Sequence, residues 1–334
     1  MKSLRMLGAG RVELVELPEP SAGAGEVVVE TAMSALCGSE LKGYRGDGQP
    51  TGNNGHEAAG VVAAVGEGVD PALLGQRVGV CAVAGCGQCE QCAAGRTTWC
   101  GSFRVYVNMH AERFVAAASA LHRLPDDLPW EPGVLLTGDG LGVPYHTSTK
   151  IAGDDVRTVA VLGAGPIGLG NVLMQAHLGR RVIAVDLSAW RLDAAKRLGA
   201  AEVIDAGAGD PVAALRELTD GRGPDVCIEA AGRPETALSC FAAVRTGGTV
   251  VFNGEQGPLQ LSPSDHFIRR DITAVGSWFY HYGEYPAMLA LYRDGLRAAD
   301  LATHTLPAAG ADEAWRLFAA GQAGKVLLDW RGAV

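Results

Sequence analysis

The chain has 334 residues, of which 48% are hydrophobic and 19% charged, a composition typical of a folded protein rather than of a disordered segment. Lysine and arginine together number 28 against 37 aspartate and glutamate residues, so the net charge of -9 would repel a nucleic-acid backbone. Aromatic residues make up only 6% of the chain, which is few for base-stacking surfaces. We therefore expect no nucleic-acid partner, and the length favours two domains.

The first residues, MKSLRMLGAGRVELVELP, lack the basic and apolar regions of a secretory signal, so we expect a cytoplasmic protein. Residues 158–179 carry no full charge and are long enough to span a bilayer. They also hold five glycines, a proline and several polar residues, which favours a buried helix behind a glycine-rich turn. We therefore expect no membrane association.

The pattern of apolar residues and glycines differs between two parts of the chain. Up to about residue 135, short alternating or β-branched runs separated by glycine predict a β-rich domain. These runs lie at residues 11–17, 26–33, 60–65 and 76–80. The tail from residue 284 contains two helical patterns and a strand at 325–330, too little for a domain of its own. We expect this tail to pack back onto the N-terminal part.

Between these parts, apolar runs alternate with helical patterns, which is typical of a parallel sheet built from βαβ units. Capping residues predict helices that begin after Ser188, at Asp210-Pro211 and at Pro234. The pattern predicts one doubly wound α/β domain. Its expected strands cover residues 158–162, 181–186, 201–204, 225–230, 248–253 and 272–277.

The first chemical motif is a glycine-rich segment, residues 163–168 (GAGPIG), between a predicted strand and a helical stretch. Its three glycines would allow a tight turn, a close approach to a pyrophosphate and close helix packing, respectively, at a helix N-terminus that favours the anion. Asp186 ends the next strand, where a carboxylate can accept both ribose hydroxyls. At a separation of about 4 Å and an effective dielectric near 20, this carboxylate would repel a 2′-phosphate by roughly 4 kcal/mol. We therefore expect NAD rather than NADP.

A glycine turn in a nucleotide-free domain is the alternative to this interpretation. Arg191 would either add charge near the adenosine or lie on a solvated helix face. The residues expected to bind the cofactor are Gly163, Gly165, Pro166, Ile167, Gly168, Asp186 and Arg191.

The second motif contains four cysteines in one loop, Cys86, Cys89, Cys92 and Cys100. Four thiolates can close a tetrahedron around zinc and leave no position open for chemistry, which indicates a structural site. The ferredoxin pattern for an iron–sulfur cluster differs, because here the last gap is seven residues and no proline follows. Redox disulfides are the remaining alternative, but such clustering in a reducing compartment favours metal.

The third constellation is dispersed over Cys37, His56 and Asp139. A thiolate, an imidazole and a carboxylate could bind zinc and leave its fourth position for water or an alcohol oxygen. From the residues alone, ordinary structural roles are the simpler explanation of these three side chains. The cysteine would be a small buried apolar residue, the histidine would be hydrogen-bonded in the core, and the aspartate would lie in the turn at 137–140.

The combination of motifs resembles the zinc-dependent medium-chain dehydrogenase/reductase superfamily along nearly the whole chain. Residues 37–40 (CGSE) are similar to its Cys-Gly-Ser/Thr-Asp block, and residues 55–57 (GHE) to its Gly-His-Glu block. The cysteine loop and the glycine-rich segment with Asp186 are similar to its structural-zinc loop and NAD fingerprint. The resemblance implies a GroES-like catalytic domain at 1–137, a Rossmann domain at 138–276 and a C-terminal return to the catalytic domain at 277–334, with the active site in the cleft between the domains.

The resemblance also implies two zinc ions per chain. The catalytic ion would be bound by Cys37, His56 and Asp139, and the structural ion by the four cysteines of the loop. Ser39 would take the alcohol proton, Glu40 would hydrogen-bond the free nitrogen of His56, and Glu57 would lie beneath the metal. A histidine that often continues the family's proton relay is absent here; Lys42 or water would serve instead.

The implied function is NAD-linked, zinc-dependent oxidation of a secondary alcohol, on a polyol, sugar or aminocyclitol, or the reverse reduction. The alternatives are an amino-alcohol dehydrogenase of the threonine type, a simple-alcohol dehydrogenase, and a non-catalytic zinc- and nucleotide-binding regulatory relative. The intact set of Cys37, Ser39 and His56 argues against the regulator, which has no need of an open metal position. A small-molecule alcohol is the expected partner, in a homo-oligomeric dimer or tetramer.

Overall fold

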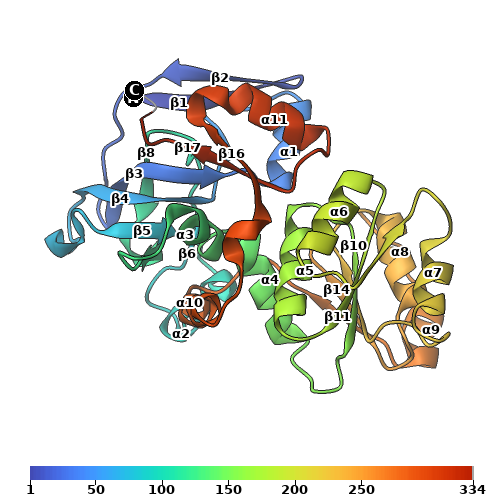
Figure 1. The fold of residues 1–334 in the computed structure, drawn as a ribbon. Coiled ribbons are helices and arrows are strands. Elements are labelled where there is room, and N and C mark those ends of the chain that lie inside the picture. Colours follow the sequence, from blue (N-terminus) through green and yellow to red (C-terminus); the bar gives the residue numbers. More distant parts are fainter. Residues whose placement is uncertain (333–334) are drawn as a thin grey trace. The chain divides into compact units, whose positions relative to one another are not determined.

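The computed structural model describes residues 1–332, and the chain divides into two compact units (Figure 1). Unit 1 contains residues 1–142 together with the C-terminal segment from residue 280, and unit 2 contains residues 143–279. These divisions lie a few residues beyond the boundaries expected from the sequence.

The described residues of unit 1 form a seven-stranded sheet in the order β16-β17-β3-β4-β5-β9, with β8 also paired to β3. The C-terminal strand β17 is antiparallel to β3, with Leu327 opposite Ala35. Two further ribbons, β1-β2 and β6-β7, complete the strands. The strands are β1 (Lys2–Gly8), β2 (Arg11–Glu16), β3 (Glu26–Ala35), β4 (Ala58–Val65), β5 (Arg77–Val80), β6 (Val83–Ala84), β7 (Arg104–Val105), β8 (Arg113–Ala117), β9 (Leu121–Arg123), β16 (Ala302–Pro307) and β17 (Lys325–Asp329).

Two helices of unit 1, α3 (Trp130–Leu136) and α11 (Ala311–Ala319), pack against its strands. Helix α11 buries Ala311, Ala314, Trp315 and Phe318, spaced at i, i+3, i+4 and i+7, so that one apolar stripe faces the core. Trp315 stacks on Tyr44 with ring centroids 5.2 Å apart. The helices are α1 (Leu41–Arg45), α2 (Glu90–Ala93), α3 (Trp130–Leu136), α10 (Tyr285–Arg293) and α11 (Ala311–Ala319), and α4 (Asp139–Lys150) begins in this unit.

Unit 2 contains a six-stranded parallel sheet in the order β12-β11-β10-β13-β14-β15. Helices α5 and α6 lie on one face, and α7 and α8 on the other (Figure 1). Because both faces are covered, the strands are almost continuous apolar runs. The elements are β10 (Thr158–Leu162), α5 (Pro166–His177), β11 (Arg181–Asp186), α6 (Ala189–Arg197), β12 (Glu202–Asp205), α7 (Pro211–Glu217), β13 (Val226–Glu229), α8 (Pro234–Ala243), β14 (Thr249–Phe252), α9 (Pro263–His266) and β15 (Thr273–Gly276).

This arrangement confirms the predicted α/β class with a doubly wound parallel sheet. The strand order reverses between β10 and β13, which is the switch point where such sheets bind ligands. The predicted caps form as well: Ser188 accepts a hydrogen bond from the Arg191 backbone, and Asp210 from that of Val212. Among residues 1–332, no helix has the length and apolar character needed to cross a membrane. The uncharged stretch at 158–179 is instead β10, the glycine-rich turn and α5.

Candidate metal centres and nucleotide-binding loop

Four potential metal ligands converge in unit 1: Cys37, His56, Glu57 and Asp139 offer donor atoms that all lie within 4.8 Å of one another. Cys37 follows strand β3, the His56–Glu57 pair precedes β4, and Asp139 begins helix α4. His56 Nε2 lies 3.1 Å from Asp139 Oδ2, and Cys37 Sγ lies 3.5 Å from the same oxygen. The fold therefore brings together the three side chains that the sequence singled out as catalytic zinc ligands.

His56 is oriented by a backbone carbonyl. Its Nδ1 lies 2.8 Å from the carbonyl oxygen of Asn54, which can only accept, so Nδ1 carries the proton and Nε2 faces Asp139. Burial by itself lowers the pKa of His56, but the neighbouring Cys37 and Asp139 raise this pKa well above its usual value. The site thus favours a positive charge at Nε2, where a proton or a metal ion would lie.

Asp139 supplies an oxygen without a partner. Its Oδ1 is buried and makes no hydrogen bond to any of the described residues. Burial alone would raise the pKa of Asp139, but His56 and Lys325 lower it, so the carboxylate is ionised. A buried, unpaired carboxylate oxygen beside a thiol and an imidazole is the donor set that zinc prefers. The residues present therefore fit a zinc ion.

The local structure around Asp139 differs from the expected turn. Helix α3 ends at Leu136, and Asp139 is already the first residue of α4. A Gly-Asp-Gly sequence is typical of a turn, but an acidic residue is also stabilised in the first turn of a helix by the helix dipole. The turn prediction was wrong for that reason.

Glu57 forms a buried ion pair that the sequence did not reveal. Its Oε1 binds Lys325 Nζ, both side chains are fully buried, and its Oε2 accepts a hydrogen bond of 3.2 Å from the backbone of Gly140. Burial raises the pKa of Glu57 and outweighs the opposing charge of Lys325. Glu57 thus links β17 to the start of the helix that carries Asp139.

Glu40 has a different partner from the one expected. It does not orient His56, whose Nδ1 already donates to the Asn54 carbonyl; instead its Oε2 lies 3.1 Å from His110 Nε2. Its Oε1 accepts a 3.0 Å hydrogen bond from the Cys37 backbone, and both Glu40 and His110 are fully buried. Burial by itself raises the pKa of Glu40, but His110 lowers it, so the carboxylate is charged. Glu40 therefore fixes the Cys37 loop.

Ser39 lies beside the thiol ligand. Its hydroxyl is exposed and donates to Cys37 Sγ over 3.3 Å. Lys42, also exposed, lies three residues further on in α1. Ser39 is therefore placed between the ligand cluster and solvent, as a group that passes a proton outward requires.

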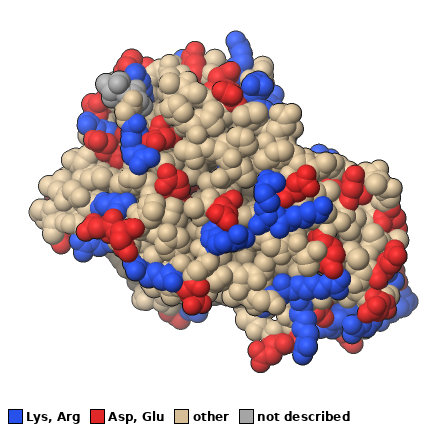
Figure 2. Space-filling model, viewed as in Figure 1, with Lys and Arg blue, Asp and Glu red and all other residues tan. Residues whose placement is uncertain are grey.

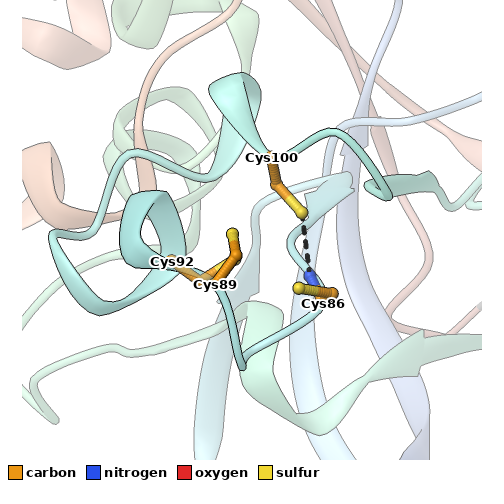
Figure 3. Close-up of side chains that lie close together, drawn as sticks. All are labelled: Cys86, Cys89, Cys92 and Cys100. Carbon is orange, nitrogen blue, oxygen red and sulfur yellow. Dashed lines mark hydrogen bonds between the residues drawn. The ribbon is translucent and has the colours of Figure 1, made fainter.

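The four cysteines of the second motif surround one point in their loop (Figure 3). Their sulfur atoms lie within 4.8 Å of one another, with Cys89 Sγ 3.5 Å from Cys92 Sγ. Zinc–sulfur bonds of about 2.3 Å in a tetrahedron imply sulfur separations of roughly 3.8 Å, so the loop fits zinc.

Backbone N–H groups favour charged sulfur in this loop. Those of Cys86 and Ser102 donate to Cys100 Sγ at 3.3 and 3.4 Å. Backbone hydrogen bonds from Gln88 and Cys89 lower the pKa of the Cys86 thiol to about 6. Burial raises that of Cys92 to about 12, a penalty that a bound cation would remove.

Substitution of Cys89 by serine should remove one zinc ion per chain and lower the melting temperature. A metal that binds only the folded loop, present at a hundred times its Kd, stabilises it by about 2.7 kcal/mol, or roughly 5 to 10 °C for a domain of this size. Elemental analysis and a thermal scan measure both effects. Cys240→Ser, a buried cysteine outside both clusters, is the control and should keep all its metal. Unchanged zinc content in Cys89→Ser would contradict the assignment.

The glycine-rich loop joins β10 to α5 in unit 2. Gly163 has a φ of 100°, and a Cβ there would lie 2.6 Å from the Ala231 nitrogen. A Cβ on Gly168 would lie 1.8 Å from the Gly163 oxygen, so the helix approaches the turn as closely as glycine permits. A Cβ on Gly165 would meet nothing within 4 Å, and Pro166 and Ile167 open the helix. The loop thus leaves open space at a helix N-terminus, which fits a pyrophosphate.

Asp186 ends β11 beside this loop. Its Oδ2 accepts a 2.7 Å hydrogen bond from the Ala164 backbone, and its Oδ1 accepts one of 2.9 Å from that of Ser188. Arg191 Nη1 lies 3.9 Å from Asp186 Oδ2. The carboxylate is therefore held at the carboxyl end of the sheet, and Arg191 lies next to it.

A metal-ligand cluster in one unit and a dinucleotide-type loop in the other are features of a two-domain, metal-dependent oxidoreductase. Residues 23–126 match the family model of the alcohol dehydrogenase GroES-like domain, and residues 166–294 match that of the zinc-binding dehydrogenases. The chain belongs to the zinc-dependent medium-chain dehydrogenase superfamily and is an enzyme of the zinc alcohol and polyol dehydrogenase type. The predicted resemblance is thereby confirmed.

Relatives with named activities match most or nearly all of the chain. It is 30% identical to an L-threonine 3-dehydrogenase of Chromobacterium violaceum, over 99% of this chain and 100% of that protein. It is also 30% identical to a sorbitol dehydrogenase of Bacillus subtilis, over 89% and 87% of the two chains. The solved structure of a short chain alcohol dehydrogenase from E. coli CFT073, complexed with NADH, superimposes with a TM-score of 0.86 at 27% identity and covers 99% of both chains.

Proposed function

We propose that this protein catalyses the NAD-linked, zinc-dependent oxidation of a secondary alcohol to a ketone, and the reverse reaction, on a polyol, sugar or aminocyclitol. The observation that carries the proposal is the cluster of Cys37, His56 and Asp139, with its unpartnered carboxylate oxygen, in a chain that also has the open glycine-rich loop. The similarity to a sorbitol dehydrogenase supports the polyol class.

In this proposal the three side chains hold a catalytic zinc, the four loop cysteines hold a structural zinc, and the glycine-rich loop with Asp186 and Arg191 holds NAD. When bound, zinc would acidify the hydroxyl group of the substrate, and NAD would accept a hydride from the carbon that bears this hydroxyl. The NADH complex of the E. coli relative supports this choice of nucleotide.

The protein's own groups position the ligands and move the proton. Ser39, exposed beside Cys37, accepts the alcohol proton and passes it to water or to Lys42. The Asn54 carbonyl keeps Nε2 of His56 turned toward the site. Two buried carboxylates position the ligands through backbone hydrogen bonds. Glu40 holds the Cys37 loop, and Glu57 holds the start of α4.

A second candidate is an amino-alcohol dehydrogenase of the threonine type, which the full-length similarity to an L-threonine 3-dehydrogenase favours. A non-catalytic regulator is disfavoured, because it would not need a donor cluster with an accessible serine beside it. We further propose a homo-oligomer, dimer or tetramer, that works in the cytoplasm; light scattering would measure its mass.

The test is a substrate screen of the zinc-loaded protein with NAD, in which NADH absorbance is followed. Polyols, aminocyclitols, L-threonine and short secondary alcohols are compared by kcat/KM. We expect the highest value for a polyol or cyclitol, with loss of activity on chelation and recovery with zinc. A higher value for L-threonine would favour the second candidate, and no NADH from any alcohol would refute the proposed activity.

Replacement of Asp186 by serine should shift the cofactor preference toward NADP by at least tenfold. At a separation of about 4 Å and an effective dielectric near 20, the carboxylate would repel a 2′-phosphate by roughly 4 kcal/mol. Serine removes this repulsion and can still accept a hydrogen bond from the ribose. The ratio of kcat/KM for NAD and NADP measures the effect. Asp193→Ser, an exposed carboxylate on α6, should leave the ratio unchanged. A wild-type preference for NADP would contradict the carboxylate argument.

A further inference from the structure

A cavity of about 540 Å³ lies in unit 2, away from the glycine-rich loop. No acidic side chain lines it within the part of the chain that the structure describes. Four arginines around one cavity are a marked local excess of positive charge in a chain whose net charge is -9 and whose acidic and basic side chains are interspersed on the face drawn in Figure 2. The lining residues are Arg216, Gly221, Arg222, Arg245, Thr246 and Arg270.

The cavity lies at the amino ends of the strands. Gly221 and Arg222 shortly precede β13, Arg245 and Thr246 precede β14, and Arg270 precedes β15. The glycine-rich loop follows the carboxyl end of β10 in the same parallel sheet, so it lies at the opposite edge.

Among the described residues, Arg245 is the one arginine of the four that pairs with acidic side chains. Arg245 Nε lies 2.6 Å from Asp225 Oδ1, and its Nη2 lies 3.3 Å from Asp155 Oδ2. Arg216 donates to the backbone carbonyl of Ala242, and Arg270 to two carbonyls, at residues 241 and 244. These bonds cap the carboxyl end of α8, but a carbonyl carries no net charge, so both guanidinium charges remain.

The remaining arginine of the lining is Arg222. The side chain of Arg222 is exposed and makes no hydrogen bond or ion pair with any of residues 1–332. Burial and the nearby charge of Arg216 lower the pKa of Arg270, so the guanidinium groups repel each other across the lining. Helix capping therefore accounts for two of the side chains but not for Arg222 or for the cavity.

We propose that this cavity binds a small anion that carries one or two phosphate groups, at a site separate from the nucleotide-binding loop. Planar guanidinium groups match phosphate oxygens in paired hydrogen bonds, and three uncompensated charges suit a multiply charged anion. The volume is within the range of small-molecule sites. The inference does not rest on the proposed dehydrogenase reaction.

The test uses the full-length, zinc-loaded protein at saturating NAD, which keeps the glycine-rich loop occupied. Inorganic pyrophosphate is titrated into it by calorimetry at low salt. We expect one saturable site per chain, and a Kd at least about tenfold weaker in Arg222→Gln, because a hydrogen bond to a charged group is worth roughly 1.5 to 3 kcal/mol. Lys196→Gln, which removes an exposed cation on α6, is the matched control and should bind as the wild type does.

Three results would overturn the proposal. They are no saturable binding by the wild type, wild-type affinity in Arg222→Gln, or equal weakening in Lys196→Gln. Citrate that binds as tightly as pyrophosphate would refute the preference for phosphate. Arg216→Gln repeats the test at a second position, and thermal scans verify that each variant is folded.

Discussion

Asp139→Asn should lose the catalytic zinc and lower turnover by at least about a thousandfold, while the structural zinc and NAD binding stay as they were. An amide is neutral and a weaker ligand than a carboxylate, and the buried oxygen it replaces has no partner among the described residues. A thousandfold loss corresponds to about 4 kcal/mol of transition-state stabilisation, within the range attributed to metal catalysis. Zinc stoichiometry and turnover in the same preparation measure the outcome.

The control for this experiment is Asp126→Asn, an exposed carboxylate outside the cluster that should retain both zinc ions and full turnover. Asp139→Cys should retain the metal through a thiolate and move the pH dependence of turnover upward, because a softer ligand donates more charge. If the asparagine variant kept both zinc and turnover, the third ligand would lie elsewhere. Glu57 would be tested next, although Lys325 and the Gly140 backbone already bind its two oxygens.

The elements of unit 2 could be predicted because their signals are local. Each of the six predicted strands forms, since a parallel strand covered on both faces is a short apolar run. Helix starts were equally readable, because Ser188 and Asp210 bind backbone groups only two or three residues away. The cysteine loop is local in the same sense, with all four sulfurs inside fifteen residues.

The supporting contacts of the metal site could not be predicted in this way. The pairs Glu40–His110 and Glu57–Lys325 are separated by 70 and 268 residues, and their partners are selected by how the strands pack. Lys325 begins an apolar strand, where a lysine would ordinarily be solvated at the end of the sheet. The expected partner of Glu40 was wrong for two reasons: Nδ1 of His56 already donates to the nearby carbonyl of Asn54, and the actual partner, His110, lies 70 residues away in the sequence. Ligand types are thus readable from the sequence, whereas the residues that hold the ligands depend on the tertiary structure.

Lys325→Met should destabilise the protein by about 3–5 kcal/mol, the usual cost of removing one partner from a buried ion pair. Methionine matches the lysine stem in size, so the loss comes from the carboxylate of Glu57, which would remain fully buried without its counter-ion. Burial by itself lowers the pKa of Lys325, but Glu57 raises it, so the lysine keeps its charge in the wild type. Urea unfolding followed by tryptophan fluorescence gives the change in unfolding free energy.

The double variant Glu57→Gln/Lys325→Met separates loss of the pair from loss of packing. With both charges removed, no ion is left buried without a partner, and stability should return to within about 1–2 kcal/mol of the wild type. The amide of glutamine can still accept the Gly140 hydrogen bond that holds the start of α4. If Lys325→Met alone were as stable as the wild type, other groups would be satisfying Glu57, and the ion pair would not be what fixes the helix that carries Asp139.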